Sequence, residues 1–167
     1  MTSMKPDIRR PEPKDAPAIA RICRNGWKQT VEGLLSRSHQ HETVQFWYGE
    51  KKVMQDIGRG RYSYVAELDG AVVGVIGGGR ASVRSGEIYV FYVDEAHRYK
   101  GIGRMLLDRL TEDHRNKGLV EQCVSVQEGN RHGQPFYEAR GFEYIGKKSQ
   151  RTGTGEVQIS LRFRRHI

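Results

Sequence analysis

The sequence has few cysteines and no long apolar run. Its two cysteines, Cys23 and Cys123, lie far apart and do not have the spacing of a metal site. We therefore expect two buried apolar side chains in a reduced, cytoplasmic protein that holds no metal. No apolar segment approaches the length of a membrane-spanning helix, and the first residues contain no apolar core of a secretory signal. These absences predict a soluble protein that makes no contact with a membrane.

Acidic residues are also in the minority. The chain contains 28 Lys and Arg against 20 Asp and Glu, which gives a net charge of +8. This excess fits simple solubility, a nucleic-acid surface or an anionic ligand. The positive charge is spread along the chain apart from a small cluster in the last residues, LRFRRHI, and no interleaving of basic and aromatic residues resembles a nucleic-acid module. We therefore expect no nucleic-acid partner.

Helix and strand patterns fill most of the chain. The hydrophobic content of 37% suffices for a core, and the length favours one domain, residues 1–167, with its folded part at about 7–164. In chain order we expect a short strand from Asp7, a helix at 15–28, helices within 29–60, a hairpin at 62–79 that turns at Asp69-Gly70, a buried strand at 87–93, a helix at 101–117, a strand at 119–126, a helix at 131–140, and strands at 142–147 and 156–163. Together they predict the α/β (α+β) class, with a mixed central sheet of six to seven strands and about four helices.

Two closely spaced glycines follow the buried strand. Gly101 and Gly103 stand where a helix should begin, and there the free backbone N–H groups and the helix dipole favour an anion. Glycine lets an anion approach the backbone closely, and Arg98, Lys100 and Arg104 add positive charge. The pattern therefore predicts a phosphate or pyrophosphate site.

Three phosphate-binding patterns can be compared with this segment. The dinucleotide fingerprint would need glycine or alanine where Leu106 stands. Residues 141–147 have the spacing of a P-loop, but Lys148 replaces the Ser or Thr that binds magnesium, and the residues between the glycines are strand-like. Residues 98–103 fill the third pattern, R/Q-x-x-G-x-G/A. Taken alone, this short motif has an alternative explanation, in which the glycines belong to an ordinary start of a helix, where they make the backbone more flexible and bind no phosphate.

Two motifs together resemble the GNAT superfamily of N-acetyltransferases. YVDEAHRYKGIGRMLL, residues 92–107, resembles the pyrophosphate loop of the acyl-CoA site in that family, with Glu95 in a slot often held by proline and Tyr99 in the first glycine slot. NRHGQPFYEARGF, residues 130–142, resembles the second signature of the family, with Gly133 in its alanine slot. The resemblance implies the GNAT fold, with two splayed central strands, and acetyl-CoA as the acyl donor for an amine.

The resemblance also implies which residues bind acetyl-CoA. The backbone of the glycine segment would hold the pyrophosphate, and the strand that precedes it would pair with the pantetheine amides. The N–H of Phe91 would polarise the thioester carbonyl, and Asn130 would hold the pantetheine arm from the next helix. The implied cofactor-binding residues are Phe91, Tyr92, Val93, Arg98, Tyr99, Lys100, Gly101, Ile102, Gly103, Arg104, Asn130 and Tyr137.

Two residues are implied to carry the chemistry. Tyr137 fills the slot of a tyrosine that protonates the departing thiolate, and a phenol with a pKa of about 10 can do so for a thiol with one of about 8.5. Its alternative role is to pack the helix against the sheet. Glu87 stands where some members of the family place a base that acts directly or through water. The equal alternative for Glu87 is an ordinary carboxylate at the start of a strand.

The amine acceptor is open between a small molecule and a peptide, the latter being a protein N-terminus or a lysine. The net charge of +8 argues against a polycationic acceptor unless the pocket is locally acidic. A sensor that binds acyl-CoA without turnover is a further alternative, and a homodimer is compatible with the sequence.

Several aromatic and histidine residues precede the hairpin. His39 and His41 are expected on the surface, because no third metal ligand is evident. An aromatic group in the N-terminal helices either shapes the acceptor site or packs in the core, and it consists of Trp27, Phe46, Trp47 and Tyr48.

Overall fold

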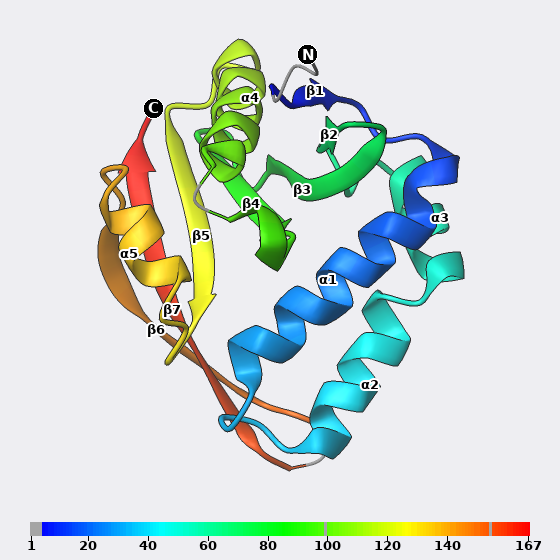
Figure 1. Cartoon of the computed structure of the whole chain (residues 1–167). Coiled ribbons are helices and arrows are strands. Elements are labelled where there is room, and N and C mark those ends of the chain that lie inside the picture. The colour runs from blue at the N-terminus through cyan, green and yellow to red at the C-terminus, as the bar shows by residue number, and fades with distance from the viewer. Residues whose placement is uncertain (1–4, 99, 154) are drawn as a thin grey trace.

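The computed structural model describes residues 5–98, 100–153 and 155–167. In these ranges the chain forms seven strands, five α-helices and two short 3₁₀ helices around one sheet (Figure 1). The strands are β1 (Asp7–Arg9), β2 (Tyr64–Leu68), β3 (Ala71–Arg80), β4 (Ser85–Val93), β5 (Glu121–Gln127), β6 (Glu143–Arg151) and β7 (Val157–His166). The helices are η1 (Pro13–Asp15), α1 (Ala16–Val31), α2 (Arg37–Trp47), α3 (Glu50–Gly58), η2 (Glu95–His97), α4 (Ile102–Asn116) and α5 (Gly133–Glu138).

The sheet has the strand order β1-β2-β3-β4-β5-β7-β6, and β4 and β5 form its parallel pair. That pair is hydrogen-bonded only from Ser85–Ile88 to Glu121–Val124. Beyond Ile88, β4 continues to Val93 beside β3 while β5 continues to Gln127 beside β7. The two central strands therefore diverge, as Figure 1 shows, and this confirms the splayed strands that the family resemblance implied.

A β-bulge lies where the two strands begin to part. Ile88 is opposite Gly78 and Val90 is opposite Gly77, so Tyr89 is an extra residue in β4. A bulge shifts the alternation of side chains between the two faces of a sheet. Accordingly, Ile88 packs in the core under α4, whereas Val90 packs in the core under α1.

Helices cover the two faces of the sheet and enclose one core on each side. The helix α4 packs Ile102, Leu106 and Leu110 against one face, where α5 adds Tyr137. On the other face, α1 packs Ile19 and its neighbours against β2, β3 and β4 together with residues of α3. Both helices present apolar residues at the spacing of one helical face, which is why the sequence predicts them clearly.

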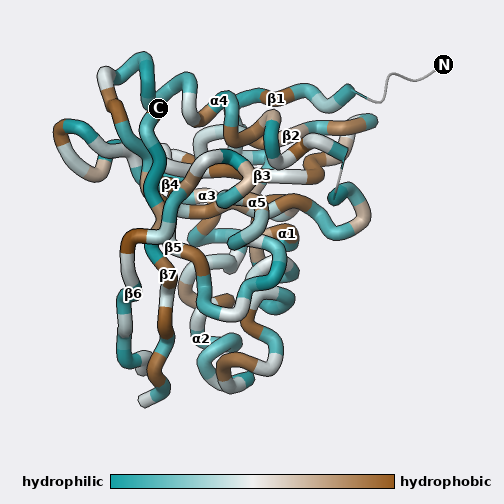
Figure 2. The backbone as a smooth tube through the Cα atoms, turned by 90° about the vertical axis from the view of Figure 1, so that its left-hand side faces the viewer, coloured by the Kyte–Doolittle hydropathy of each residue, from teal (hydrophilic) through white to brown (hydrophobic). Residues whose placement is uncertain are grey.

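The β6–β7 hairpin extends away from the body of the sheet and reaches α2. Figures 1 and 2 show the far ends of these two strands beside the first turn of α2. The backbone N–H of Ser36 donates to Glu156 Oε2 at 2.8 Å, and the Ser36 hydroxyl donates to the other oxygen of that carboxylate. Ser36 also caps α2 by accepting the His39 N–H at 3.1 Å. One serine therefore starts the helix and connects it to the hairpin.

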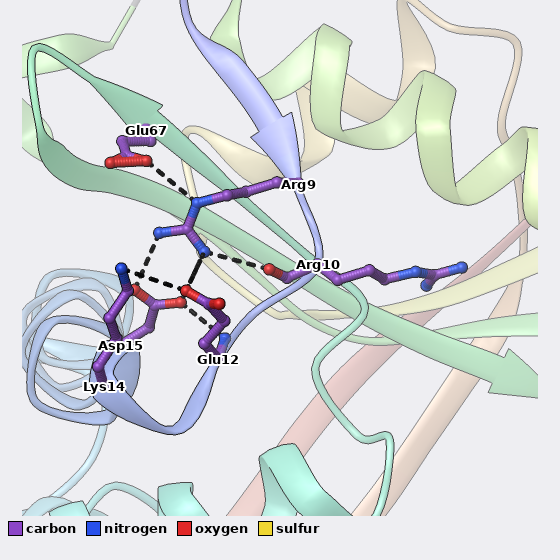
Figure 3. A network of polar contacts seen from close by, with 6 residues as sticks. All are labelled: Arg9, Arg10, Glu12, Lys14, Asp15 and Glu67. Carbon is purple, nitrogen blue, oxygen red and sulfur yellow. Dashed lines mark hydrogen bonds and ion pairs between the residues drawn. The ribbon is translucent and has the colours of Figure 1, made fainter.

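An arginine at the end of β1 joins three elements (Figure 3). Arg9 donates to both carboxylate oxygens of Asp15, at 2.8 and 3.0 Å, and its Nε donates to Glu67 at 3.0 Å. Asp15 also accepts the Glu12 N–H at 2.7 Å, which closes a capping box before α1. The network fixes β1 and the start of α1 against β2, and it satisfies every group that it buries.

The class, the sheet and the hairpin at Asp69-Gly70 agree with the sequence. The helix content agrees as well, with five α-helices where about four were expected. The helices expected within 29–60 are α2 and α3, and the extended backbone of Gly49 separates them.

Candidate active site

The divergence of β4 and β5 opens a cavity of about 490 Å³. The outer halves of both strands line it, together with α5, α1, α2 and the β6–β7 hairpin. Beside the cavity lies the glycine end, by which we mean Arg98 and residues 100–104; a Cβ atom on Gly103 would be 3.6 Å from the ring of Phe91, which lines the cavity. The polar end is a part of the cavity lining itself, and it consists of Trp27, Thr30, His39, Thr43, Trp47, Tyr48, Arg61, Ser125, Gln127, Gln150, Gln158 and Ser160.

Gly101 gives the glycine end its shape. Its φ of 81° is left-handed, and it is the N-cap residue of α4. The first helical hydrogen bond runs from the Met105 N–H to the Gly101 carbonyl at 3.1 Å, so the amides of residues 102–104 have no partner within the helix. Glycine at the cap has no side chain to occupy them. This turn therefore presents free N–H groups and the positive end of a helix dipole to an anion.

The basic residues of the glycine end point in different directions. Lys100 and Arg104 are exposed to solvent, whereas the Arg98 guanidinium donates to the side-chain oxygen of Gln29 on α1. Gln29 in turn donates to Glu95 at 2.8 Å. Arg98 thus connects the loop to α1. Tyr99, which belongs to the same motif, lies outside the described residues.

The rim of β4 offers main-chain donors to the cavity. The Asp94 N–H donates to the Val73 carbonyl on β3 at 2.8 Å. Because successive N–H groups of a strand alternate in direction, the amide of Tyr92 points toward β3, and those of Phe91 and Val93 point toward the gap. Tyr92 instead contributes its ring, which is packed against Gly26 of α1. Of the three predicted strand residues, Phe91 and Val93 therefore direct their amides toward the gap, and Phe91 also lines the cavity.

Asn130 and Tyr137 line the cavity from the opposite wall. The Asn130 side-chain oxygen accepts the N–H groups of His132 and Gly133, both at 3.0 Å, where α5 begins. The Tyr137 ring packs edge-on against Phe142 at 5.1 Å and Phe136 at 5.4 Å between ring centroids. Burial raises the pKa of Tyr137, so its phenol stays protonated throughout the neutral range. The residue both packs the helix and lines the cavity.

Glu87 lies on β4 before the strands diverge. The Arg162 guanidinium donates to its two oxygens, at 2.7 and 3.0 Å, and also to the Ser125 hydroxyl at 2.8 Å. Glu87 is therefore ion-paired across β5, on the face of the sheet that the polar end occupies. The structure thus places Glu87 beside the cavity lining and does not bring it into direct contact with Tyr137.

Sequence reasoning placed His39 on the surface, and that interpretation was wrong. Its Nε2 lies 3.2 Å from the Gln158 side-chain oxygen, and the Gln158 amide donates to Gln127 at 3.0 Å. His39 thus lines the polar end, whereas His41 is exposed as expected. Among the four aromatics, Phe46 is 62% exposed and the other three line the cavity.

The sequence did not indicate four other residues of the polar end, which are Arg61, Gln127, Gln150 and Gln158. They come from the loop before β2 and from β5, β6 and β7, and no motif connects these segments in the sequence. These residues come together only in the folded protein.

Other features of the described residues bear on ligand chemistry. Within residues 5–98, 100–153 and 155–167, no group of three or more His, Cys, Asp or Glu side chains could hold a metal ion. Cys23 and Cys123 are free and buried, as the sequence indicated. In the same ranges no helix combines the length and the apolar character that crossing a bilayer requires.

Comparison with known proteins agrees with this geometry. Residues 26–142 match the model of the acetyltransferase (GNAT) family, and the chain therefore belongs to that family. Membership supports an acyltransferase that uses coenzyme A. A comparison of the sequence with curated proteins found no match.

Solved structures confirm the fold. The PaiA N-acetyltransferase from Thermoplasma acidophilum, in complex with coenzyme A, is 22% identical over 95% of this chain and 98% of its own, with a TM-score of 0.77. A GCN5-related N-acetyltransferase from Rhodopseudomonas palustris is 19% identical over 100% and 98%, with a TM-score of 0.79. YncA from Salmonella typhimurium, a putative acetyltransferase with its cofactor acetyl-CoA, is 22% identical over 97% and 94%, with a TM-score of 0.69.

Proposed function

We propose that the protein transfers the acetyl group of acetyl-CoA to a primary amine of a small molecule or peptide. The observation that carries the proposal is the gap between β4 and β5, with the free amides at the start of α4 near Phe91 on its rim and the polar end in the cavity that the gap opens. A thioester that lies in this gap would meet an amine from the opposite side. The family match and the neighbours that contain coenzyme A support this donor.

Each part of the donor has a proposed partner in the chain. The amides of residues 102–104 bind the pyrophosphate, while the β4 rim pairs with the pantetheine arm. The Phe91 N–H donates to the thioester oxygen and stabilises the negative charge that develops there. The side-chain oxygen of Asn130 is already occupied, so its NH₂ group remains to donate to the arm.

The chemical step needs two proton transfers. The amine nitrogen attacks the carbonyl carbon, a C–N bond forms and the C–S bond breaks. Glu87, directly or through a water, accepts the proton that the amine loses, and Tyr137 donates its phenolic proton to the departing thiolate. Burial favours the neutral phenol, which is the form that this role requires.

The contact between the β6–β7 hairpin and α2, near the polar end, favours a small acceptor. The hairpin tip contacts α2 through Ser36 and Glu156, and this contact joins two of the elements that supply the cavity wall. We also propose that residues 1–167 act as one N-acetyltransferase domain, because a single sheet joins β1 to β7. The free cysteines favour a reducing, cytoplasmic setting. The homodimer stays a prediction.

The test separates binding from turnover. Acetyl-CoA at about 100 times its dissociation constant should stabilise the fold by about 2.7 kcal/mol, measured as a rise in melting temperature. A panel of amines and peptides with acetyl-CoA should then release free thiol. No thermal shift at millimolar acetyl-CoA contradicts the binding site, and a shift without thiol release from any acceptor favours the sensor.

A further inference from the structure

Arg61 holds a positive charge at the wall of the cavity. It lies between α3 and β2 and lines the polar end. Its guanidinium carbon is 4.4 Å from the centroid of the Trp47 ring and 5.6 Å from that of Tyr89, the bulged residue of β4. Stacking on two rings fixes a guanidinium plane while leaving its edge available for hydrogen bonds. The side chain is therefore oriented before any ligand arrives.

No described residue supplies this guanidinium with a counter-ion. Among the described residues no carboxylate forms an ion pair with Arg61, and its Nε is buried without a hydrogen-bond partner. The arginines of two other sites differ, since Arg9 is bound by Asp15 and Glu67 (Figure 3) and Arg162 by Glu87. A buried donor without a partner is unfavourable, and a charged one more so. The arrangement indicates that a ligand supplies the acceptor atoms.

The surroundings of Arg61 offer no negative charge of their own. Burial, the largest cause, raises the pKa of Cys23, Tyr48 and Tyr62, and the charge of Arg61 only partly opposes it, so all three stay protonated. Asp56, close by in the sequence, forms an ion pair with Lys52 at 3.2 Å. Within the described parts of the chain, no carboxylate lies within 4.0 Å of the guanidinium to neutralise it.

The rest of the cavity wall is polar but uncharged. Among the described residues that line the cavity, none is Asp or Glu. Apart from Arg61, the lining residues with polar side chains include Gln, Ser, Thr, Asn, His and Tyr. Such a wall gives a polycation no partner, whereas an anion gains from Arg61. Glu87 is adjacent, but its charge is already balanced by Arg162.

We propose that the acceptor is an amine that carries a carboxylate, and that Arg61 binds this carboxylate through its free edge. The inference rests on the proposed acetyl transfer and names the acceptor class for that site. A planar carboxylate matches the paired N–H groups of a guanidinium. It can belong to a free amino acid or to an acidic side chain beside a peptide amine, and Arg61 recognises the same chemistry in both.

The experiment compares acceptors that differ only in the carboxylate. Free L-amino acids are tested against their amides, and dipeptide amides beginning with Asp or Glu against those beginning with Asn or Gln. Thiol release with acetyl-CoA gives kcat/KM, and tryptophan fluorescence with coenzyme A present gives binding without turnover, since Trp47 contacts Arg61. At least one carboxylate acceptor should exceed its amide by about 10-fold to 100-fold in both readouts.

Variants assign the preference to Arg61. Arg61→Gln should remove it, and Arg61→Lys should restore part of it because the charge returns. Arg59→Gln is the matched control, because Arg59 lies on the same loop with 69% of its side chain exposed and should leave the preference intact. The acetyl-CoA thermal shift should be equal in all four proteins.

Each other outcome overturns the inference in an identifiable way. Equal binding of the carboxylate and amide forms, no binding of any carboxylate, or a preference that survives Arg61→Gln would each refute it. If these amides are acetylated as well as the acids, the proposed function stands and the inference fails. If acetyl-CoA neither binds nor releases thiol, the proposed function fails, while fluorescence still decides whether Arg61 binds a carboxylate.

Discussion

The glycine end and the polar end are built from different parts of the chain. The glycine end uses one short segment, and its ligand contacts would be main-chain N–H groups of α4. The polar end uses side chains from α1, α2, the loop before β2 and strands β5 to β7. A site made of main-chain groups suits a ligand that is the same in every member of a family, because it does not depend on which side chains are present. A site made of side chains suits a ligand that differs from one member of a family to another. Changes at one end should therefore leave the other end largely intact.

The largest effect is expected at Tyr137, which lines the cavity. Tyr137→Phe keeps the ring that packs on Phe136 and Phe142 but removes the proton donor, so kcat should fall by about 10²- to 10⁴-fold. Acetyl-CoA affinity, measured by calorimetry, should stay within about twofold because one O–H is lost and no packing changes. Tyr144→Phe is the control, because Tyr144 is 53% exposed on β6.

The pH profile gives a second view of the same residue. Since burial raises the pKa of Tyr137, its acid form persists above the ordinary phenol value of about 10. The alkaline fall in kcat that this residue causes should begin only beyond that value. Equal rates for wild type and Tyr137→Phe across the pH range would remove the acid role.

The next effect isolates the glycine end. Gly101→Val should weaken acetyl-CoA binding by roughly 100-fold, about 2.7 kcal/mol, because a β-branched residue is strained at a φ of 81° and the amides would lose their direction. Gly118→Val is a close control at the other end of α4, since Gly118 has a φ of 80° and equally open surroundings. Both variants should lose similar stability, and only the first should lose binding.

Glu87 tests whether one carboxylate serves both structure and chemistry. Glu87→Gln and Arg162→Gln each break the same ion pair, and each should lower stability by about 1.5–3 kcal/mol in chemical denaturation. If Glu87 is the base, only Glu87→Gln should also reduce kcat by about 100-fold. Equal kcat losses in the two variants would reduce Glu87 to a structural role.

The smallest effect concerns the polar end alone. Ser36→Ala removes the cap of α2 and a contact with the hairpin, and it should cost about 1 kcal/mol, or about 2–4 °C in melting temperature. The KM of the acceptor should rise while acetyl-CoA affinity stays unchanged. Ser38→Ala, at an exposed position in the same helix, is the control. Equal changes in both affinities would contradict the independence of the two ends.

Local signals made much of this molecule predictable from its sequence. Three such signals are the apolar stripe of α4, the glycine at its start and the run of β-branched and aromatic residues in β4. Each of them lies within one short segment of the sequence and predicts the element that this segment forms. The divergence of β4 and β5 came from the family resemblance, because nothing in either strand alone says where hydrogen bonding stops. Helices were expected within 29–60, but the apolar spacing there is too weak to give the bounds of α2 and α3.

Apart from the aromatic residues Trp27, Trp47 and Tyr48, which were candidates for the acceptor site, the polar end and the ion pair beside it could not be predicted, because their contacts are long-range. Glu87 and Arg162 are 75 positions apart, and His39 and Gln158 are 119 apart. A histidine that contacts a glutamine in the folded protein looks like a surface histidine in the sequence. For Arg61 the informative property is the absence of a counter-ion, and this can be seen only once every neighbouring side chain is in place.

The short ladder between β4 and β5 has a consequence for the main chain around it. Four residue pairs join these two strands, and the Glu87–Arg162 ion pair connects β4 with β7 beside them. Beyond these pairs, the edge of β4 that faces the gap lacks a neighbouring strand. Under the proposed function, the pantetheine arm of the donor would supply main-chain partners there and would take the place of a strand for as long as it is bound.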